Sequence, residues 1–366
     1  MTNTQYHAAH QYNPAVAYND DDAQWLVVWH DGRNGTNYGI YGQRVDRNGT
    51  LLGFGAPITI WDDANSLQNP AVAYDTTQRR YLVVWQNVTS PAIEGRVINA
   101  DGTFYSSRFS ITTGTLARTV PDVAYNPVMD EYLVVWQHAE ATGGDIRARK
   151  VSTEGVIDPG GTYAISDETA DERYPAVEAY PADGRYLVVW SSDRSGSFNV
   201  VGRRLLSNGS VTGSLFGIST GSGQEYYPDL AFNPANGQAL VVWLEWEQGT
   251  LRGRPVNSDN TRGTEFLISG DADPLYNTAI AYSPLDSKYL VIWNHSLNIR
   301  GQWVNSNGSV DGGSFLICNQ MSANIALAFG PDRFLAAWQD LRNSTWDIYG
   351  QLVSFRKFLY LPLILR

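Results

Sequence analysis

The sequence has 366 residues, of which only 17% are charged and 12% are aromatic. Its formal net charge of -11 argues against nucleic acid as a partner, because a phosphate-binding surface needs an excess of Lys and Arg. No stretch reaches the roughly 18 apolar residues of a membrane-spanning helix, so we expect no transmembrane segment. Cys318 is the only cysteine, which excludes an intramolecular disulfide and a thiolate metal cluster.

In chain order, each of several internal repeats begins with a segment of small and β-branched residues, first seen at residues 14–18 (PAVAY). Further copies stand at residues 70–74, 121–125, 175–180, 228–232, 278–282 and 325–329. This composition predicts a strand. Because the side chains are small, we expect the strand to lie innermost in a radial fold, where the sheets crowd around a central channel.

The second segment of each repeat is apolar on both faces and ends in Trp. Its copies are residues 25–29 (WLVVW), 81–85, 132–136, 186–190, 239–243, 289–293 and 334–338. They follow one another at intervals of about 50 residues, the period of a propeller repeat. A strand without a polar face is typical of one packed between two neighbouring sheets. We therefore expect the terminal Trp rings to fill the space between the blades.

A third segment begins with Gly, or with Ala148 in the third repeat, and a weaker fourth segment follows it. The third is found at residues 42–45, 95–97, 202–205, 253–256, 301–304 and 350–353, and examples of the fourth are 57–60, 109–111 and 315–317. Pairs such as Asn208-Gly209 and Asn307-Gly308 predict hairpin turns, because these residue types tolerate positive φ. Four hairpin-linked strands per repeat match one propeller blade.

These repeats predict an all-β, seven-bladed β-propeller with four antiparallel strands per blade, forming a single domain over residues 11–353. The expected blades are residues 11–60, 67–113, 118–167, 172–220, 225–270, 276–319, and 322–353 plus a C-terminal apolar tail, 354–366. The seventh repeat lacks a normal fourth strand, and we expect residues 358–365 to supply it. The alternatives are a strand from the segment before Tyr12, a loose anchoring or sorting tail, and a strand that pairs with a neighbouring molecule.

The unit PxVAY…YLVVW…IYGQxV…NG resembles the repeats of secreted bacterial β-propeller proteins, which are often found as extracellular arrays. The resemblance covers residues 13–353 and implies the fold and an extracellular or cell-surface location. It supplies no catalytic residue, because those repeats are mostly uncharacterised. The ending, residues 357–366, is similar to short apolar tails of some exported bacterial proteins. Residues 1–5 lack the basic and apolar regions of a secretory leader, so a secreted protein would be represented here by its mature form.

The candidates for ligand binding are aromatic residues outside the repeat positions. A propeller binds ligands at the end that carries the loops between second and third strands and the links between blades, which we call the loop face. Aromatic rings among Asp, Asn and Gln suit stacking on sugars or a protein interface. The candidates are Trp61, Trp246, Trp346, Tyr38, Tyr226 and Tyr227, with Phe198 nearby. The alternative is that each ring caps the outer edge of its blade.

Acidic residues in the same loops offer the oxygen ligands that calcium prefers. The candidates are Asp62, Asp63, Asp167, Asp171, Asp271 and Asp273. No segment matches a defined calcium loop, so a structural Ca²⁺ and solvated acidic turns are both open interpretations. We expect no cofactor to be required.

Two charge pairs recur after the repeat Trp, Asp31 with Arg33 and Asp340 with Arg342. Recurrence at equivalent positions predicts an ion pair that stabilises the loop. Cys318 follows an apolar strand, and we expect it to be packed rather than nucleophilic.

Three histidines, His30, His138 and His295, also follow the repeat Trp, but they belong to blades too far apart for one tetrahedral metal site. We expect them to be solvated loop residues.

Together these features favour a non-catalytic extracellular module that recognises a glycan or a protein through the loop face. One alternative is a structural cell-surface protein that assembles with copies of itself. Another is a polysaccharide hydrolase that uses paired carboxylates in the channel, since glycosidases act with two carboxyl groups. The Ser-x-Asp-x-Gly-x-x-Trp box typical of sialidase propellers is absent, and nothing in the sequence singles out a carboxylate pair.

Overall fold

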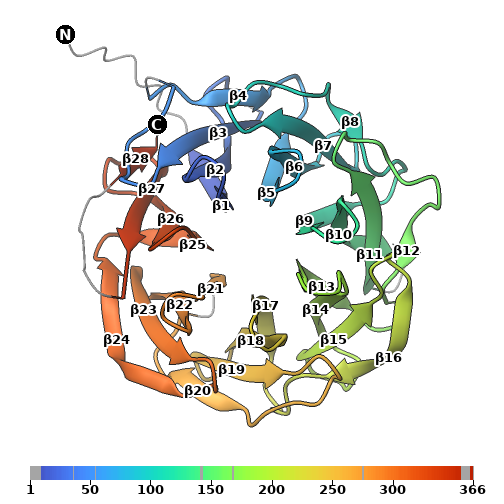
Figure 1. Cartoon of the computed structure of the whole chain (residues 1–366), viewed down its shortest axis with the longest axis vertical. Coiled ribbons are helices and arrows are strands. Elements are labelled where there is room, and N and C mark those ends of the chain that lie inside the picture. Colours follow the sequence, from blue (N-terminus) through green and yellow to red (C-terminus); the bar gives the residue numbers. More distant parts are fainter. Residues whose placement is uncertain are drawn as a thin grey trace.

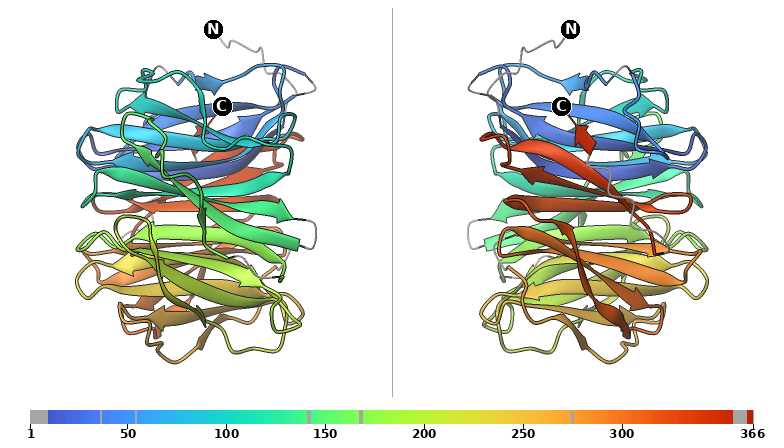
Figure 2. Two further views of the ribbon diagram at one scale, coloured as in Figure 1. Left: turned by 90° about the vertical axis from the view of Figure 1, so that its right-hand side faces the viewer. Right: turned by 90° about the vertical axis from the view of Figure 1, so that its left-hand side faces the viewer.

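The computed structural model describes residues 10–35, 37–53, 55–140, 143–166, 169–273, 276–355 and 363–365. These residues form 28 strands in seven four-stranded antiparallel sheets, which surround a central channel as the blades of a propeller (Figure 1). Seen from the side, the sheets form a short cylinder (Figure 2). The predicted all-β, seven-bladed propeller is confirmed. Within these ranges, no helix has the length and apolar character needed to cross a membrane.

Each blade uses four strands that follow one another in the sequence, from the channel outwards. Blades one to four are β1 (Gln11–Asn19), β2 (Gln24–Asp31), β3 (Gly39–Asp46), β4 (Ile58–Trp61); β5 (Leu67–Asp75), β6 (Arg80–Asn87), β7 (Ala92–Asn99), β8 (Phe109–Ser110); β9 (Arg118–Asn126), β10 (Glu131–Glu140), β11 (Gly143–Ser152), β12 (Tyr163–Ala164); and β13 (Glu172–Ala179), β14 (Tyr186–Ser192), β15 (Asn199–Leu205), β16 (Val211–Gly217). Blades five to seven are β17 (Glu225–Asn233), β18 (Gln238–Glu245), β19 (Thr250–Val256), β20 (Phe266–Ser269); β21 (Thr278–Ser283), β22 (Lys288–His295), β23 (Asn298–Asn305), β24 (Val310–Cys318); and β25 (Ser322–Phe329), β26 (Phe334–Asp340), β27 (Asp347–Val353), β28 (Leu363–Leu365).

The second strand of each blade packs against both neighbouring blades. In β2, Leu26 and Val28 contact the core shared with blade two, whereas Val27 and Trp29 contact the core shared with blade seven. Successive side chains of a strand point to opposite faces of the sheet. An uninterrupted apolar segment is therefore what a sheet needs when both of its faces are covered.

The seven repeat Trp residues lie between the blades, as predicted. Each is at most 2% exposed: Trp29, Trp85, Trp136, Trp190, Trp243, Trp293 and Trp338. Each ring packs on the preceding blade, and Trp85, for example, joins the core that contains Leu26 and Val28. Trp29 does the same between the first and last blades, where its core includes Leu335.

The innermost strands contain an irregularity at the loop-face end in blades one to five and seven. One residue there is left-handed, with φ values of 50° at Asn13, 50° at Asn69, 49° at Val120, 55° at Tyr174, 54° at Tyr227 and 44° at Asn324. The pairing register with the second strand shifts at the same places. Asn tolerates this conformation well, but it is uncommon for Val and Tyr.

The ring closes between blades one and seven. The backbone N–H of Gln11 donates to the carbonyl of Trp346 at 2.7 Å, and the side-chain Oε1 of Gln11 accepts from the N–H of Ile348 at 2.9 Å. The outermost strand of blade seven is β28, which pairs antiparallel with β27 from Gly350↔Leu363 to Ile348↔Leu365. The tail strand β28 therefore supplies the fourth strand of this blade. Residues 1–9, which make up most of the alternative segment before Tyr12, lie outside the described residues.

Candidate functional site

Five aromatic side chains of blades four and five gather at the loop face. We call this group the rim cluster, and it comprises Tyr174, Phe198, Tyr226, Tyr227 and Trp246. Ring centroids are 4.3 Å apart for Tyr174 and Tyr227, 5.0 Å for Phe198 and Tyr226, and 5.9 Å for Tyr226 and Trp246. Trp246 is 40% exposed. Three of the predicted ligand-binding residues, Tyr226, Tyr227 and Trp246, thus form one accessible aromatic surface.

A polar cleft of about 370 Å³ adjoins the rim cluster at Tyr174. Its other lining residues are Gln137, Ala139, Glu140, Gly143, Gly144, Asp171 and Arg173. Arg173 donates from Nε to Asp171 Oδ2 at 2.8 Å, and its guanidinium lies 5.0 Å from the centre of the Phe198 ring. This hydrogen bond raises the pKa of Arg173, so the side chain is held as an oriented cation. The cleft therefore places fixed donors and acceptors beside aromatic rings.

Two other predicted ligand-binding residues, Tyr38 and Trp346, lie in a different aromatic group, where the ring closes. Tyr12 is its centre, with ring centroids 5.5 Å from His30, 6.0 Å from Tyr38 and 6.4 Å from Trp346. The N–H of Trp346 donates to His10 Nδ1 at 3.1 Å, which ties blade seven to blade one. Burial lowers the pKa of His30 to about 3, so its ring is neutral. These contacts support a structural role in closure.

The sixth candidate, Trp61, lies apart from both groups, at the end of the outermost strand of blade one. Its indole N–H donates to Asp63 Oδ2 at 2.9 Å. The guanidinium groups of Arg96 and Arg108 lie 5.4 Å and 4.8 Å from its ring. This ring covers the outer edge between blades one and two, which was the alternative interpretation for all six residues.

The residues that suggested calcium do not form one group. Asp62 accepts from the hydroxyl of Tyr41 at 2.6 Å, Asp63 from Arg108 Nη1 at 2.9 Å, and Asp171 Oδ1 from the N–H of Gly144 at 3.0 Å. Asp271 accepts from the hydroxyl of Ser269. Asp273 lies in the same link, and Asp167 is outside the described residues. Among the residues that the structure describes, no three His, Cys, Asp or Glu side chains are close enough to hold one metal ion.

The recurring charge pairs form as predicted. Asp31 and Arg33 approach to 2.5 Å, and so do Asp340 and Arg342. Each carboxylate also accepts the backbone N–H of its arginine at 2.8 Å. Both Asp residues are buried, so the pairs order the loops that follow β2 and β26.

The remaining sequence candidates lie in local contacts. His138 Nε2 lies 3.5 Å from Glu140, and His295 Nδ1 lies 3.5 Å from Asp271. Cys318 is 5% exposed, and burial raises the pKa of its thiol. It packs 3.6 Å from Asp340 Oδ2, which agrees with a packing role rather than a nucleophilic one.

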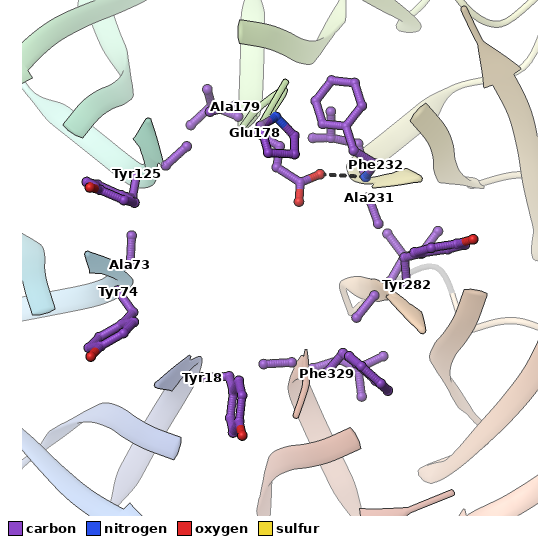
Figure 3. A pocket seen from close by; sticks show the side chains of 18 of the residues that line it. Tyr18, Ala73, Tyr74, Tyr125, Glu178, Ala179, Ala231, Phe232, Tyr282 and Phe329 are labelled. Carbon is purple, nitrogen blue, oxygen red and sulfur yellow. Dashed lines mark hydrogen bonds between the residues drawn. The ribbon is translucent and has the colours of Figure 1, made fainter. Parts of the chain in front are cut away.

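Described residues of the innermost strands line two cavities in the central channel. One, of about 480 Å³, opens at the loop face and is lined by the start of each innermost strand, including Asn13, Asn69, Tyr174, Tyr227 and Asn324. The other, of about 580 Å³, occupies the opposite half, where Tyr and Phe side chains surround it (Figure 3). Asp122 and Asp229 line both cavities.

Among the described residues that line this channel, three carry carboxyl groups, and each of these links two blades. Asp122 Oδ2 accepts from the N–H of Val177 at 2.8 Å, and Asp229 Oδ2 from that of Ile280 at 3.0 Å. Glu178 points into the channel and accepts from the N–H of Phe232 at 2.8 Å (Figure 3). Burial raises the pKa of Asp122 to about 6, of Asp229 to about 7 and of Glu178 to about 8.

Five residues of the channel and the cleft were not singled out from the sequence: Asp122, Glu178, Asp229, Tyr174 and Arg173. A signal for the acids was present, because each places a carboxyl group within the otherwise uncharged segment of its repeat: PDVAY, PAVEAY and PDLAF. Only the ring, however, brings residues of three separate repeats into one channel.

No protein-family model matches this sequence, and no curated protein sequence matches it. Solved structures do match in fold. An oligogalacturonate lyase in complex with manganese has a TM-score of 0.58 at 9% identity, covering 95% of this chain and 90% of that one. A protein from Lactobacillus plantarum has a TM-score of 0.57 at 14% identity, covering 98% and 97%. A prolyl endopeptidase has a TM-score of 0.55 at 10% identity, covering 96% of this chain but 50% of that chain, so this chain spans about half of that enzyme. At identities this low, the likeness shows the β-propeller fold and carries no activity.

Proposed function

We propose that this propeller is an extracellular binding module that recognises a carbohydrate at the loop face of blades four and five. The observation that carries the proposal is the rim cluster with its adjoining cleft. Tyr226 and Trp246 present ring surfaces to solvent, and Arg173, Asp171 and Gln137 provide polar groups beside them. Rings supply stacking area while fixed polar groups orient hydroxyls, which is the usual composition of a small-ligand site.

The rim cluster suits this role better than the aromatic group around Tyr12. The backbone and side chains of that group join blade one to blade seven, so its contacts are already used in closure. Trp246, in contrast, leaves 40% of its surface exposed at the end of the cluster.

The test is a binding screen with neutral linear oligosaccharides of the malto-, cello-, xylo- and chito- series, followed by calorimetry on any that bind. Trp246→Ala and Tyr226→Ala should each weaken binding by at least about tenfold, as expected for aromatic anchors. Trp61→Ala is the matched control, since it removes an aromatic ring elsewhere on the surface, and it should bind as the unaltered protein does. Failure of every oligosaccharide to bind, or equal loss with Trp61→Ala, would contradict the proposal.

A second candidate function is hydrolysis of a glycosidic bond in the channel. The observation in its favour is the difference in pKa between Glu178, at about 8, and Asp122, at about 6. Both residues line the 580 Å³ cavity, and a carboxyl group that keeps its proton beside one that loses it more readily is the division of roles that acid–base hydrolysis needs. Release of reducing sugar that Glu178→Gln and Asp122→Asn both abolish would establish it. Binding without any release would leave the binding module as the function.

A further inference from the structure

The loop-face mouth of the channel is continuous with the rim cluster through two tyrosines. Tyr174 and Tyr227 line the 480 Å³ cavity, and Tyr174 also lines the polar cleft. The cluster therefore extends from exposed Trp246, through Tyr226, to the wall of the channel. A ligand that lies across the rim cluster has a direct path into the mouth.

The two tyrosines occupy a position that is Asn in three other blades. Asn13, Asn69 and Asn324 hold the same left-handed conformation as Tyr174 and Tyr227. Asn adopts this conformation more readily than a bulky residue does. Blades four and five thus carry large rings where the backbone favours a small amide, and residues kept in a disfavoured conformation concentrate at ligand sites.

The opposite wall of the mouth consists of these amides. Asn13 Nδ2 donates to Asn69 Oδ1 at 2.5 Å, Asn69 Nδ2 to Gln86 Oε1 at 3.0 Å, and Asn324 Nδ2 to Gln339 Oε1 at 3.1 Å. The bonds fix the direction of each amide. The mouth therefore has a stacking wall on one side and a hydrogen-bonding wall on the other, within a volume typical of small-ligand sites, roughly 300–1,000 Å³.

The shape and charge of the mouth restrict what can enter. The innermost strands surround it, so a linear chain can enter only by one end. Asp122 and Asp229 lie in its floor, and no Lys, Arg or His is found among the described residues that line it. An anionic sugar would meet carboxylates without a compensating cation, at a cost in desolvation and repulsion.

We propose that the channel mouth is a subsite for the terminal residue of an uncharged oligosaccharide, so that the module recognises chain ends rather than chain interiors. This inference rests on the proposed function, because the rim cluster would hold the sugars that follow the terminal one. Tyr174 and Tyr227 stack on the terminal ring, and Asn13, Asn69 and Asn324 orient its hydroxyls.

The test uses a neutral oligosaccharide that binds in the screen, in three forms: unmodified, blocked at the non-reducing end by a 4,6-O-benzylidene group, and coupled through the reducing end to a bulky fluorophore. One end-blocked form should lose at least about tenfold in affinity while the other binds as the unmodified sugar does. An analogue that ends in a uronic acid should bind more weakly than its neutral counterpart. Equal affinity of both blocked forms and the unmodified sugar would overturn the inference.

The variants Tyr174→Asn and Tyr227→Asn test whether the two tyrosines contact the ligand or only pack within the protein. Each installs the residue found in blades one, two and seven, so the thermal midpoint should be kept or raised while affinity falls by at least about tenfold. The matched control is Leu297→Asn, which relieves a left-handed residue (φ 72°) in the β22–β23 turn of blade six. This control should raise the midpoint and leave binding unchanged.

The outcomes separate the inference from the proposed function. If Trp246→Ala abolishes binding but Tyr174→Asn and Tyr227→Asn bind normally and melt at a lower temperature, the tyrosine pair is only packing. The rim would then remain the binding site, and end recognition would be wrong. If no neutral oligosaccharide binds, both proposals fail together.

Discussion

The carboxylate of Asp122 in blade three reaches the backbone of blade four, where its Oδ2 accepts a hydrogen bond from the N–H of Val177 at 2.8 Å. Glu178 makes the corresponding link from blade four to blade five, and Asp229 from blade five to blade six. Blades three to six are therefore joined at the channel by side chains that change charge near neutral pH.

Stability should fall as the pH rises through the range in which these acids titrate. Their pKa values in the folded protein, about 6, 7 and 8, lie above the ordinary values of 3.8 for Asp and 4.5 for Glu. The folded state thus retains protons that the unfolded state has lost. The stabilisation is complete below the ordinary values and disappears above pH 8. Urea denaturation should show a free energy of unfolding lower at pH 9 than at pH 5 by at least about 1.4 kcal/mol, the equivalent of one pKa unit.

Glu178→Gln is the variant that checks this assignment. Its amide oxygen can still accept from the N–H of Phe232, but it cannot ionise, so the loss of stability between pH 5 and pH 9 should be smaller. Glu154→Gln, at an exposed turn, should keep the full dependence. An unchanged pH profile in Glu178→Gln would show that this carboxyl is not responsible.

The ion pair after β26 should contribute measurably to stability. Asp340 is fully buried and accepts from Arg342 Nη2 at 2.5 Å, from the N–H of Arg342 at 2.8 Å and from Trp338 Nε1 at 3.3 Å. Asp340→Asn removes the charge that three donors share, so we expect the free energy of unfolding to fall by about 1–3 kcal/mol. Urea denaturation of this variant beside Glu154→Gln measures the effect, and a loss equal to that of the control would mean that the pair is dispensable.

Removing the tail should expose a strand edge. Without residues 356–366, the outer N–H and C=O groups of β27 that now pair with β28 become unpaired. Unpaired edges promote association with other strands. We expect a lower thermal midpoint and more oligomer in light scattering than for the full chain. A synthetic peptide of residues 357–366 should reverse both effects, whereas a scrambled peptide should not; association unaffected by either peptide would speak against edge pairing.

The thiol of Cys318 should be unreactive until the protein unfolds. It is 5% exposed, and burial raises its pKa, so little thiolate is available at neutral pH. Reaction with a coloured disulfide reagent should be slow in buffer and rapid in concentrated urea. Fast labelling of the native protein would show that the blade around β24 opens readily.

The fold could be predicted from local sequence because the apolar pattern of each repeat indicates which faces of its strands are buried. The segment ending in Trp85 is apolar at every position, and in the structure its two faces pack against two different neighbouring blades. The Asp31–Arg33 pair was predictable for the same reason, since its partners are two residues apart and recur in the last blade.

The candidate site was only partly predictable. Tyr226, Tyr227 and Trp246 were recognised as aromatic residues of the loop face, but so were Tyr38 and Trp346, which instead lie where the ring closes. The sequence offered no means of separating the two groups. The difference depends on which blades become neighbours when the first and last repeats meet.

The sequence by itself determined the number of blades, the order of strands within each and the identity of the side chains between them, because these depend on interactions within one repeat or between successive repeats. Closure of the ring decided which side chains meet across the channel. Asp122, Glu178 and Asp229 come from three repeats, and Tyr174 lies across the mouth from Asn13, more than a hundred residues earlier in the sequence. Such groups meet only when a radial arrangement brings the same position of every repeat to one axis, and no local pattern encodes the distance across it.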